Sequence, residues 1–114
     1  MVAYIPDQGD VVWIDFEPQK GREIKKKRPA LIISPKSYNK KAGLALAMPI
    51  TSHIKGYPFE VPINSVEVEG VILVDHVRSL DWKVRNAKKI TTLSKNIMQD
   101  ALTKLAILVG WDSV

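Results

Sequence analysis

The residue types that could do chemistry stand at the ends of short apolar segments. Arg28 precedes PALIIS, Thr51 and Ser52 follow GLALAMPI, and a polar group follows GVILV: Asp75, His76 and Arg78. A guanidinium can clamp a phosphate through two hydrogen bonds, a hydroxyl can orient a substrate oxygen, and a carboxylate or imidazole can carry a proton. The pattern is therefore compatible with chemistry at a phosphate.

Each of these residues also has an ordinary structural explanation. An Arg before a Pro is commonly a solvated surface charge, and a Thr after a strand commonly forms a turn. A strand-end Asp commonly pairs with a nearby Arg or caps a turn. Taken singly, the residues therefore do not establish a site.

Metal and thiol chemistry are not expected from this sequence. The chain has no Cys, which excludes disulfides, zinc–thiolate sites and thiol catalysis. It has no Gly-rich phosphate loop and no HExxH motif, and His53 and His76 fall at unrelated loop and strand-end positions. We therefore predict no metal site and no cofactor.

Positive charge is concentrated in one segment. Residues 20 to 28 hold six basic side chains against Glu23 alone, a net +5 that equals the net charge of the whole 114-residue chain. The rest of the chain holds equal numbers of basic and acidic side chains. A local basic segment favours a polyanion site, with nucleic acid as the leading candidate, whereas the alternative is a solvated loop that only aids solubility.

Alternation of apolar and polar residues, interrupted by prolines and glycines, predicts the elements that must position these residues. Residues 9–16 alternate as a half-buried strand, and residues 17–27, broken by Pro18 and Gly21, form a long mobile loop. Residues 29–34 form a short strand, 36–42 a turn or single helical turn, and 43–50 a buried strand. Residues 59–63 form an edge strand because of their prolines. Residues 70–74, apolar on both faces, form a central strand, and residues 86–93 form one more short strand.

The C-terminal segment is expected to be a structural helix. Ser94 is a suitable N-cap, Met98, Leu102, Leu105 and Val109 recur every three or four residues, and Gly110 ends the pattern. Five to seven short strands followed by one terminal helix predict a mainly β fold in the form of a small, strongly bent barrel.

Length and composition bound the organisation of the chain. Its 114 residues suit one domain spanning residues 1–114. Hydrophobic residues make up 46% and charged residues 25%, as in soluble globular domains. There is no long apolar run and no basic-then-apolar start, so we expect a cytoplasmic protein with no signal peptide and no membrane partner.

The motifs GDVVWIDFEPQKG, RPALIISP followed by Tyr38 and Asn39, PITS, KGYPFEV and GVILVDHVRSLDW resemble, in order and spacing, those of the MazF/PemK toxins. These are sequence-specific endoribonucleases of bacterial toxin–antitoxin pairs. The resemblance runs from about Tyr4 to Gly110. It implies a homodimer of SH3-like barrels of the PemK/CcdB-like kind and cleavage of single-stranded mRNA. It also implies inhibition by a cognate MazE-like antitoxin whose acidic C-terminal tail occupies the RNA groove.

The resemblance also assigns candidate catalytic residues. The family's RPA arginine and P-x-T-S threonine fall on Arg28 and Thr51, and its glutamate after the loop glycine falls on Glu23. Relatives often carry His where this chain has Arg22, and some carry Arg where it has Leu73. A histidine proton shuttle or an arginine contact at those two positions is therefore not implied.

RNA cleavage without a metal uses the neighbouring 2′-OH as nucleophile and leaves a 2′,3′-cyclic phosphate and a 5′-OH. It needs charge stabilisation at the phosphoryl oxygens and a route for two protons. We assign Arg28 to transition-state stabilisation and Thr51 to orientation. The general base stays open among Glu23, Asp75 and His76.

Binding has separate candidates. The side chains expected to contact RNA are Lys20, Arg22, Lys25, Lys26, Lys27, Asn39, Ser52, Lys55, Asp75, His76 and Arg78. Trp13, Tyr57 and Trp82 are candidates for stacking on bases, and burial in the core or in an interface is an equally good explanation for them.

Two other functions fit the same sequence. One is a non-enzymatic poison or binding module on the same barrel, like the gyrase-binding toxins of related fold, because a fold does not fix a function. The other is an inactive relative that only binds RNA or antitoxin. The combination of Arg28 and Thr51 favours the endoribonuclease.

Overall fold

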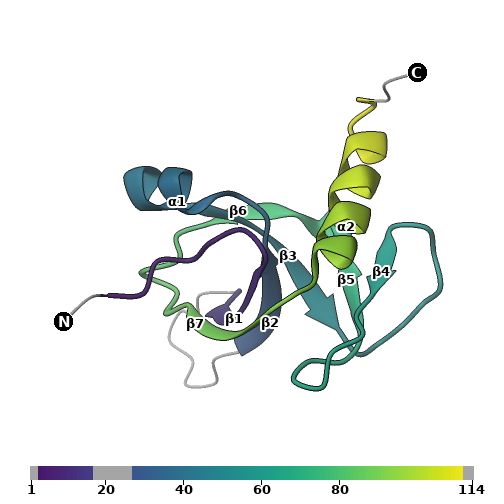
Figure 1. Ribbon diagram of the computed structural model, residues 1–114, viewed down its shortest axis with the longest axis horizontal. Helices are drawn as coiled ribbons and strands as arrows, with labels where there is room; N and C mark the ends of the chain where they lie inside the picture. The colour runs from purple at the N-terminus through teal and green to yellow at the C-terminus, as the bar shows by residue number, and fades with distance from the viewer. Residues whose placement is uncertain (1–2, 17–26, 112–114) are drawn as a thin grey trace, which may run out of the picture.

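The structure, a computed structural model, describes residues 3–16 and 27–111 (Figure 1). Within these ranges the elements are β1 (Asp10–Asp15), β2 (Lys27–Ile32), α1 (Lys36–Ala42), β3 (Ala45–Thr51), β4 (Glu60–Pro62), β5 (Val71–Leu73), the 3-10 turn η1 (Val74–His76), β6 (Arg78–Leu80), β7 (Lys88–Thr92) and α2 (Lys95–Leu108). The expectation of a mainly β fold that ends in a helix is confirmed.

The strands form one bent antiparallel sheet. Its order is β4-β5-β3-β2-β1-β7, and β6 pairs with β3 beside this path. As predicted, β4 lies at an edge, and β5 lies between two neighbours. α2 packs against the β4 and η1 end of the sheet, whereas α1 lies at the other side of the molecule (Figure 1). None of the helices in the described ranges is long and apolar enough to cross a membrane.

Both faces of the bent sheet are covered by apolar side chains, which form two separate clusters. Leu31 and Met48 belong to the cluster that α2 covers, whereas Ile14 and Ile32 belong to the cluster that contains Trp82. Adjacent strand residues point to opposite faces, so β2 supplies both clusters with alternate side chains. The edges of this doubly packed sheet are where polar side chains can reach solvent.

Two strands differ from the expectation. β2 begins at Lys27, so Arg28 is a strand residue paired with Ile14 and does not stand at the junction before the strand. β6 was not predicted, because three residues that follow a turn carry no readable alternation. It is a strand because β3 is long enough to pair with it, Ala47 lying opposite Arg78.

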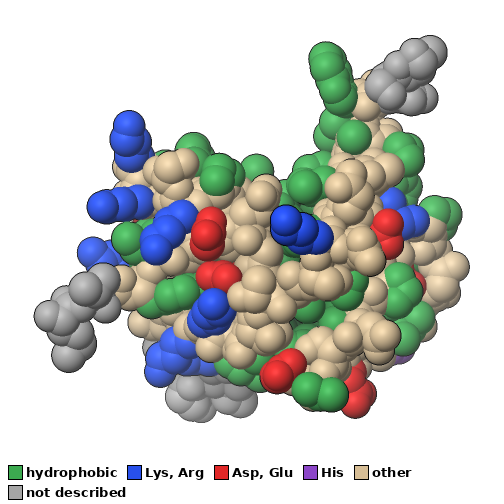
Figure 2. Space-filling model, viewed as in Figure 1, with side chains coloured by type: hydrophobic (Ala, Val, Ile, Leu, Met, Phe, Trp, Pro, Cys, Tyr) green, Lys and Arg blue, Asp and Glu red, His purple; other side chains and the backbone are tan. Residues whose placement is uncertain are grey.

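The terminal helix begins as predicted and is buried over only part of its predicted apolar face. The Ser94 hydroxyl accepts a hydrogen bond from the backbone N–H of Ile97. Met98 and Ala101 are buried, whereas Val109 is 67% exposed. The C-terminal half of α2 extends beyond the sheet, and hydrophobic side chains gather along it (Figures 1 and 2).

Asn39 is an interior residue, which corrects its assignment to RNA binding. It is fully buried in α1, and its amide group donates to the carbonyl oxygens of Pro6 at 2.9 Å and Ser34 at 3.0 Å. Its own side-chain oxygen accepts from the Ser34 hydroxyl, and its backbone carbonyl accepts from the Trp82 indole. Asn39 therefore joins α1 to the core, and the buried Trp82 is not free to stack on a base.

Candidate functional site

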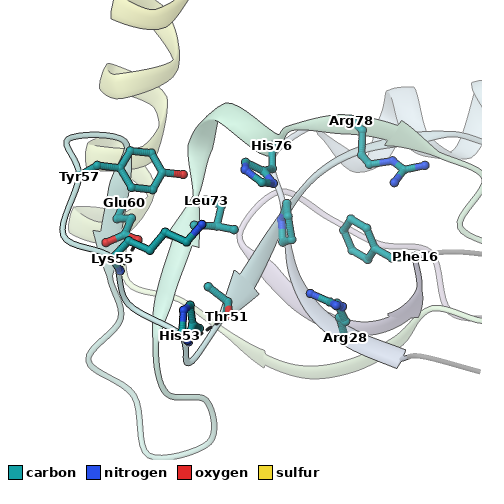
Figure 3. A pocket seen from close by; sticks show the side chains of 11 residues that line it. Phe16, Arg28, Thr51, His53, Lys55, Tyr57, Glu60, Leu73, His76 and Arg78 are labelled. Carbon is teal, nitrogen blue, oxygen red and sulfur yellow. Dashed lines mark hydrogen bonds between the residues drawn. The ribbon is translucent and has the colours of Figure 1, made fainter.

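A pocket of about 480 Å³ opens where the ends of several strands meet (Figure 3). Its walls come from β2 to β6, from η1, from the segment 52–59 that follows β3, and from Phe16 directly after β1. The lining residues are Phe16, Arg28, Pro49, Thr51, His53, Lys55, Tyr57, Glu60, Leu73, His76 and Arg78. Side chains from distant parts of the sequence therefore share one cavity.

Strand register brings Arg28 and Thr51 together. β2 and β3 pair with Ala30 opposite Pro49. Arg28 and Thr51 each lie two residues beyond this pair on their own strands, toward the same end of the antiparallel strand pair. Alternate residues of a strand project from the same face, and both side chains line the pocket (Figure 3). Strand pairing thus carries the two predicted catalytic residues to the same end of β2 and β3.

Thr51 is held in place by its backbone surroundings. It pairs with Val71 of β5, and its hydroxyl oxygen accepts the backbone N–H of His53 at 3.1 Å. Gly70 adopts a φ of +120°, and a Cβ there would lie 2.2 Å from the Thr51 carbonyl oxygen. Only glycine fits so close an approach without displacing the strand. Gly70 therefore lets β5 close against the end of β3.

The segment between β3 and β4 is fixed by a buried carboxylate. Glu60 is 8% exposed, and its two oxygens accept the backbone N–H groups of Lys55 at 2.9 Å and Gly56 at 2.8 Å. These hydrogen bonds compensate for burial of the charge. They also fix the backbone from which His53 and Lys55 enter the pocket.

Two further contacts hold the same segment. The Tyr57 hydroxyl donates to the Asp75 carboxylate at 2.7 Å, and the Lys104 ammonium of α2 donates to the Pro58 carbonyl at 2.7 Å. The hydrogen bond to Asp75 raises the pKa of Tyr57 to about 12, with burial and the negative charge adding to the effect. Tyr57 is therefore a neutral hydrogen-bond donor near neutral pH.

The electrostatics of the pocket favour an anion. Arg28, Lys55 and Arg78 face the cavity against the single carboxylate of Glu60, which is already hydrogen-bonded. The Arg78 guanidinium also lies 5.5 Å from the centre of the Phe16 ring, a cation–π contact that restrains both side chains. Among the residues that the structure describes, no group of three or more His, Cys, Asp and Glu side chains could hold a metal ion. The arrangement suits a phosphate.

Residues 7–109 match the family model of the PemK-like, MazF-like toxins of type II toxin–antitoxin systems. The chain belongs to this toxin family. It is 44% identical over 107 residues to Endoribonuclease toxin MazF of Escherichia coli (strain K12), covering 94% of this chain and 96% of the relative. It is 35% identical to Endoribonuclease toxin ChpB of the same strain, covering 90% and 93% of the two chains.

Solved MazF structures share the fold. The crystal structure of MazE–MazF (Form-II) from Deinococcus radiodurans matches with a TM-score of 0.90 and 44% identity, covering 96% of this chain and all of the matched chain. A more distant match, an endoribonuclease from Mycobacterial species, has a TM-score of 0.76 at 19% identity and supports the fold alone. The MazF-like fold thus extends over nearly the whole chain.

Apart from the buried Asn39, the site residues predicted from the sequence fall into three groups. Those that line the pocket are Arg28, Thr51, Lys55, His76 and Arg78. Asp75 contacts the pocket through Tyr57, and the exposed residues Lys27 and Ser52 lie beside lining residues in the sequence. Lys20, Arg22, Glu23, Lys25 and Lys26 lie outside the described residues, and their roles stay predictions.

Sequence reasoning missed five lining residues: Phe16, Pro49, His53, Glu60 and Leu73. Phe16 alternates with the apolar side chains of β1 and was counted only as core, and Glu60 looked like the outward residue of an edge strand. His53 and His76 do fall at loop and strand-end positions as expected, but these positions are not unrelated, because both side chains line this pocket. Of the stacking candidates, Tyr57 lines the pocket, whereas Trp13 is 45% exposed elsewhere on β1.

We predict that Glu60→Gln weakens RNA binding by about tenfold. The amide nitrogen cannot accept a backbone N–H, so one anchor of the 52–59 segment is lost, at a cost of about 1–3 kcal/mol. Fluorescence anisotropy with a 2′-O-methyl RNA, which cannot be cleaved by 2′-OH attack, measures this affinity. Glu69→Gln, at an exposed position, is the matched control. Wild-type affinity in Glu60→Gln would show that the carboxylate does not position the segment.

Proposed function

We propose that this protein is the toxin of a toxin–antitoxin pair and cleaves single-stranded mRNA in the cytoplasm as a sequence-specific endoribonuclease. One observation carries the proposal: Arg28 and Thr51 line one cationic pocket, in a chain that belongs to the MazF-like toxins. The relatives named Endoribonuclease toxin MazF and ChpB match over at least nine-tenths of this chain and support the same activity.

The proposed reaction needs no cofactor. The 2′-hydroxyl attacks the adjacent phosphorus, the bond to the 5′-oxygen breaks, and the products carry a 2′,3′-cyclic phosphate and a 5′-OH. Negative charge develops on the phosphoryl oxygens, where the Arg28 guanidinium would stabilise it. Thr51, at the end of the opposite strand, would orient the phosphate or the attacking hydroxyl by hydrogen bonding.

RNA binding would extend from the pocket along its cationic rim. Lys55 and Arg78 face the cavity and would hold flanking phosphates, which gives affinity without reading sequence. Lys27 and Ser52 are exposed close by in the sequence, and we assign the basic residues of segment 20–26 to the same role. Because phosphate contacts release counterions, this affinity would fall as salt rises.

The partner we propose is a MazE-like antitoxin with an acidic C-terminal tail. The cationic pocket that suits RNA also suits a run of carboxylates, so such a tail would compete with substrate. Relatives 43–44% identical to this chain have been crystallised as MazE–MazF complexes. An acidic tail bound in this pocket would therefore inhibit RNA cleavage by excluding the substrate.

We also propose the finer architecture of an SH3-like barrel assembled as a homodimer. Supporting it, Ile107, Val109 and Trp111 are 56%, 67% and 78% exposed at the free end of α2. Apolar side chains gathered at an exposed helix end commonly mark a protein interface. A second copy of the chain would cover this end of α2.

The cleavage chemistry can be tested with one modified substrate. An RNA with a single 2′-deoxy nucleotide on the 5′ side of the scissile bond should bind and resist cleavage, because it lacks the nucleophile. The unmodified RNA should be cleaved at nearly the same rate with excess EDTA. Mapping of the new 5′ ends and analysis of the 3′ termini measure both. Cleavage of the deoxy substrate, or EDTA inhibition that Mg²⁺ reverses, would contradict the mechanism.

Substitution of Arg28 tests the assignment of the site. Arg28→Ala should lower the single-turnover cleavage rate by roughly 10²-fold or more, the scale of losing one preorganised charge stabiliser. Arg28→Lys should recover only part of the rate, because it keeps the charge and loses the planar fork. Both variants should keep the wild-type circular dichroism spectrum, since Arg28 is exposed. A fully active Arg28→Ala enzyme would place the active site elsewhere.

The dimer proposal is tested by light scattering. Wild-type protein should have twice the mass of one chain, and Ile107→Lys combined with Val109→Lys should shift it toward the monomer, because burying an unpaired charge in an interface is costly. Val66→Lys, at a loop position that is 94% exposed, is the matched control. A dimer unchanged by the double substitution would exclude the end of α2 as the interface.

A further inference from the structure

Both histidines of this chain line the same pocket. The sequence contains two His residues, and His53 and His76 enter the cavity from different segments (Figure 3). His53 lies two residues beyond the end of β3, and His76 ends η1, which directly follows β5. β3 and β5 are antiparallel, with Thr51 opposite Val71, so the segments that follow them leave opposite ends of this strand pair. The two imidazoles therefore enter the one cavity from different directions (Figure 3).

The other side chains in the described part of the pocket are poorly suited to moving a proton near neutral pH. Guanidinium and ammonium groups hold their protons too tightly, and a threonine hydroxyl without an adjacent base does not release one. Both oxygens of Glu60 accept backbone N–H groups, and the Tyr57 hydroxyl donates to Asp75. Histidine is the side chain whose ordinary titration lies closest to neutral pH.

Phosphodiester cleavage by a 2′-hydroxyl requires two proton transfers. One group must take the proton from the attacking 2′-OH, and another must give a proton to the departing 5′-oxygen. Two imidazoles satisfy both requirements when one is neutral and the other is protonated. The pocket holds them beside Arg28 and Thr51, which have no part in these transfers.

We propose that His53 and His76 are a general acid–base pair for RNA cleavage in this protein. One imidazole takes the 2′-OH proton as the oxygen–phosphorus bond forms, and the other, as imidazolium, protonates the 5′-oxygen as its bond to phosphorus breaks. Exchange with water returns both to their starting states, so protons balance and no cofactor is consumed. The inference rests on the proposed endoribonuclease function and assigns proton transfer to residues other than Arg28 and Thr51.

Charged and titratable neighbours from every side of the pocket would affect the pair. They are Arg28 of β2, Lys55 and Tyr57 of the 52–59 segment, Glu60 of β4, Asp75 of η1 and Arg78 of β6. The variants in the test therefore change only the imidazoles and leave these groups in place.

The test compares wild type, His53→Ala and His76→Ala as full chains in single-turnover cleavage across pH 5 to 9. Wild type should give a bell-shaped pH–rate profile, and each variant should lose about 10²-fold or more in rate together with one limb of the profile. Added imidazole should restore part of the rate. Affinity for a 2′-O-methyl RNA should stay close to wild type, and Gln99→Ala, an exposed α2 residue, should be fully active.

A substrate with sulfur in place of the scissile 5′-oxygen separates the two roles. A thiolate leaves without protonation, so this substrate should restore the rate of the variant lacking the acid and not that of the variant lacking the base. The proposal is overturned if either single variant cleaves RNA at the wild-type rate. It is also overturned if the rate loss is matched by lost affinity, or if the sulfur substrate restores both variants or neither. The proposed function itself fails separately, if wild-type protein cleaves no RNA.

Discussion

The antiparallel register between β2 and β3 is the constraint on which the site depends. Ala30 lies opposite Pro49, and Arg28 and Thr51 follow two residues further along their strands, at the end where both strands meet the pocket. A slip of one residue would turn every side chain of β2 to the other face of the sheet. Leu31 and Ile32 belong to different apolar clusters, so such a slip would move each of these side chains out of its own cluster and toward the other one. The packing that stabilises the fold thus also keeps the two candidate catalytic residues at the same end of β2 and β3.

Polar contacts hold the segment 52–59, which contains no strand or helix. Glu60 holds the backbone of Lys55 and Gly56, Tyr57 is bound to Asp75, and Lys104 reaches the carbonyl of Pro58. A buried carboxylate is stable only when its hydrogen bonds are satisfied, so the position of the segment and the burial of Glu60 depend on each other. This arrangement presents His53 and Lys55 to a substrate with little freedom left to lose on binding.

Much of the fold could be read from local pattern, because its signals are local. The alternation of β1 and the Ser94 cap of α2 each depend on residues close in sequence, and the motifs around Arg28 and Thr51 are short. Other features depend on tertiary pairing. Nothing in KSYNKKA shows that Asn39 points inward, since its amide is satisfied by Pro6 and Ser34. The presence of His53 and His76 in one cavity likewise depends on how several strands are arranged in the sheet, which no single segment encodes.

We propose that RNA binds in the pocket that contains Arg28 and Thr51. Backbone amide shifts during titration with an uncleavable 2′-O-methyl single-stranded RNA test it most directly. The account predicts that the largest shifts fall on Arg28, Thr51, Lys55 and Arg78, and that they diminish as salt is raised. The exposed lysines of α1, Lys36, Lys40 and Lys41, form a separate basic group on the other side of the molecule and serve as the internal comparison. Shifts concentrated on α1, with the pocket unaffected, would contradict the account.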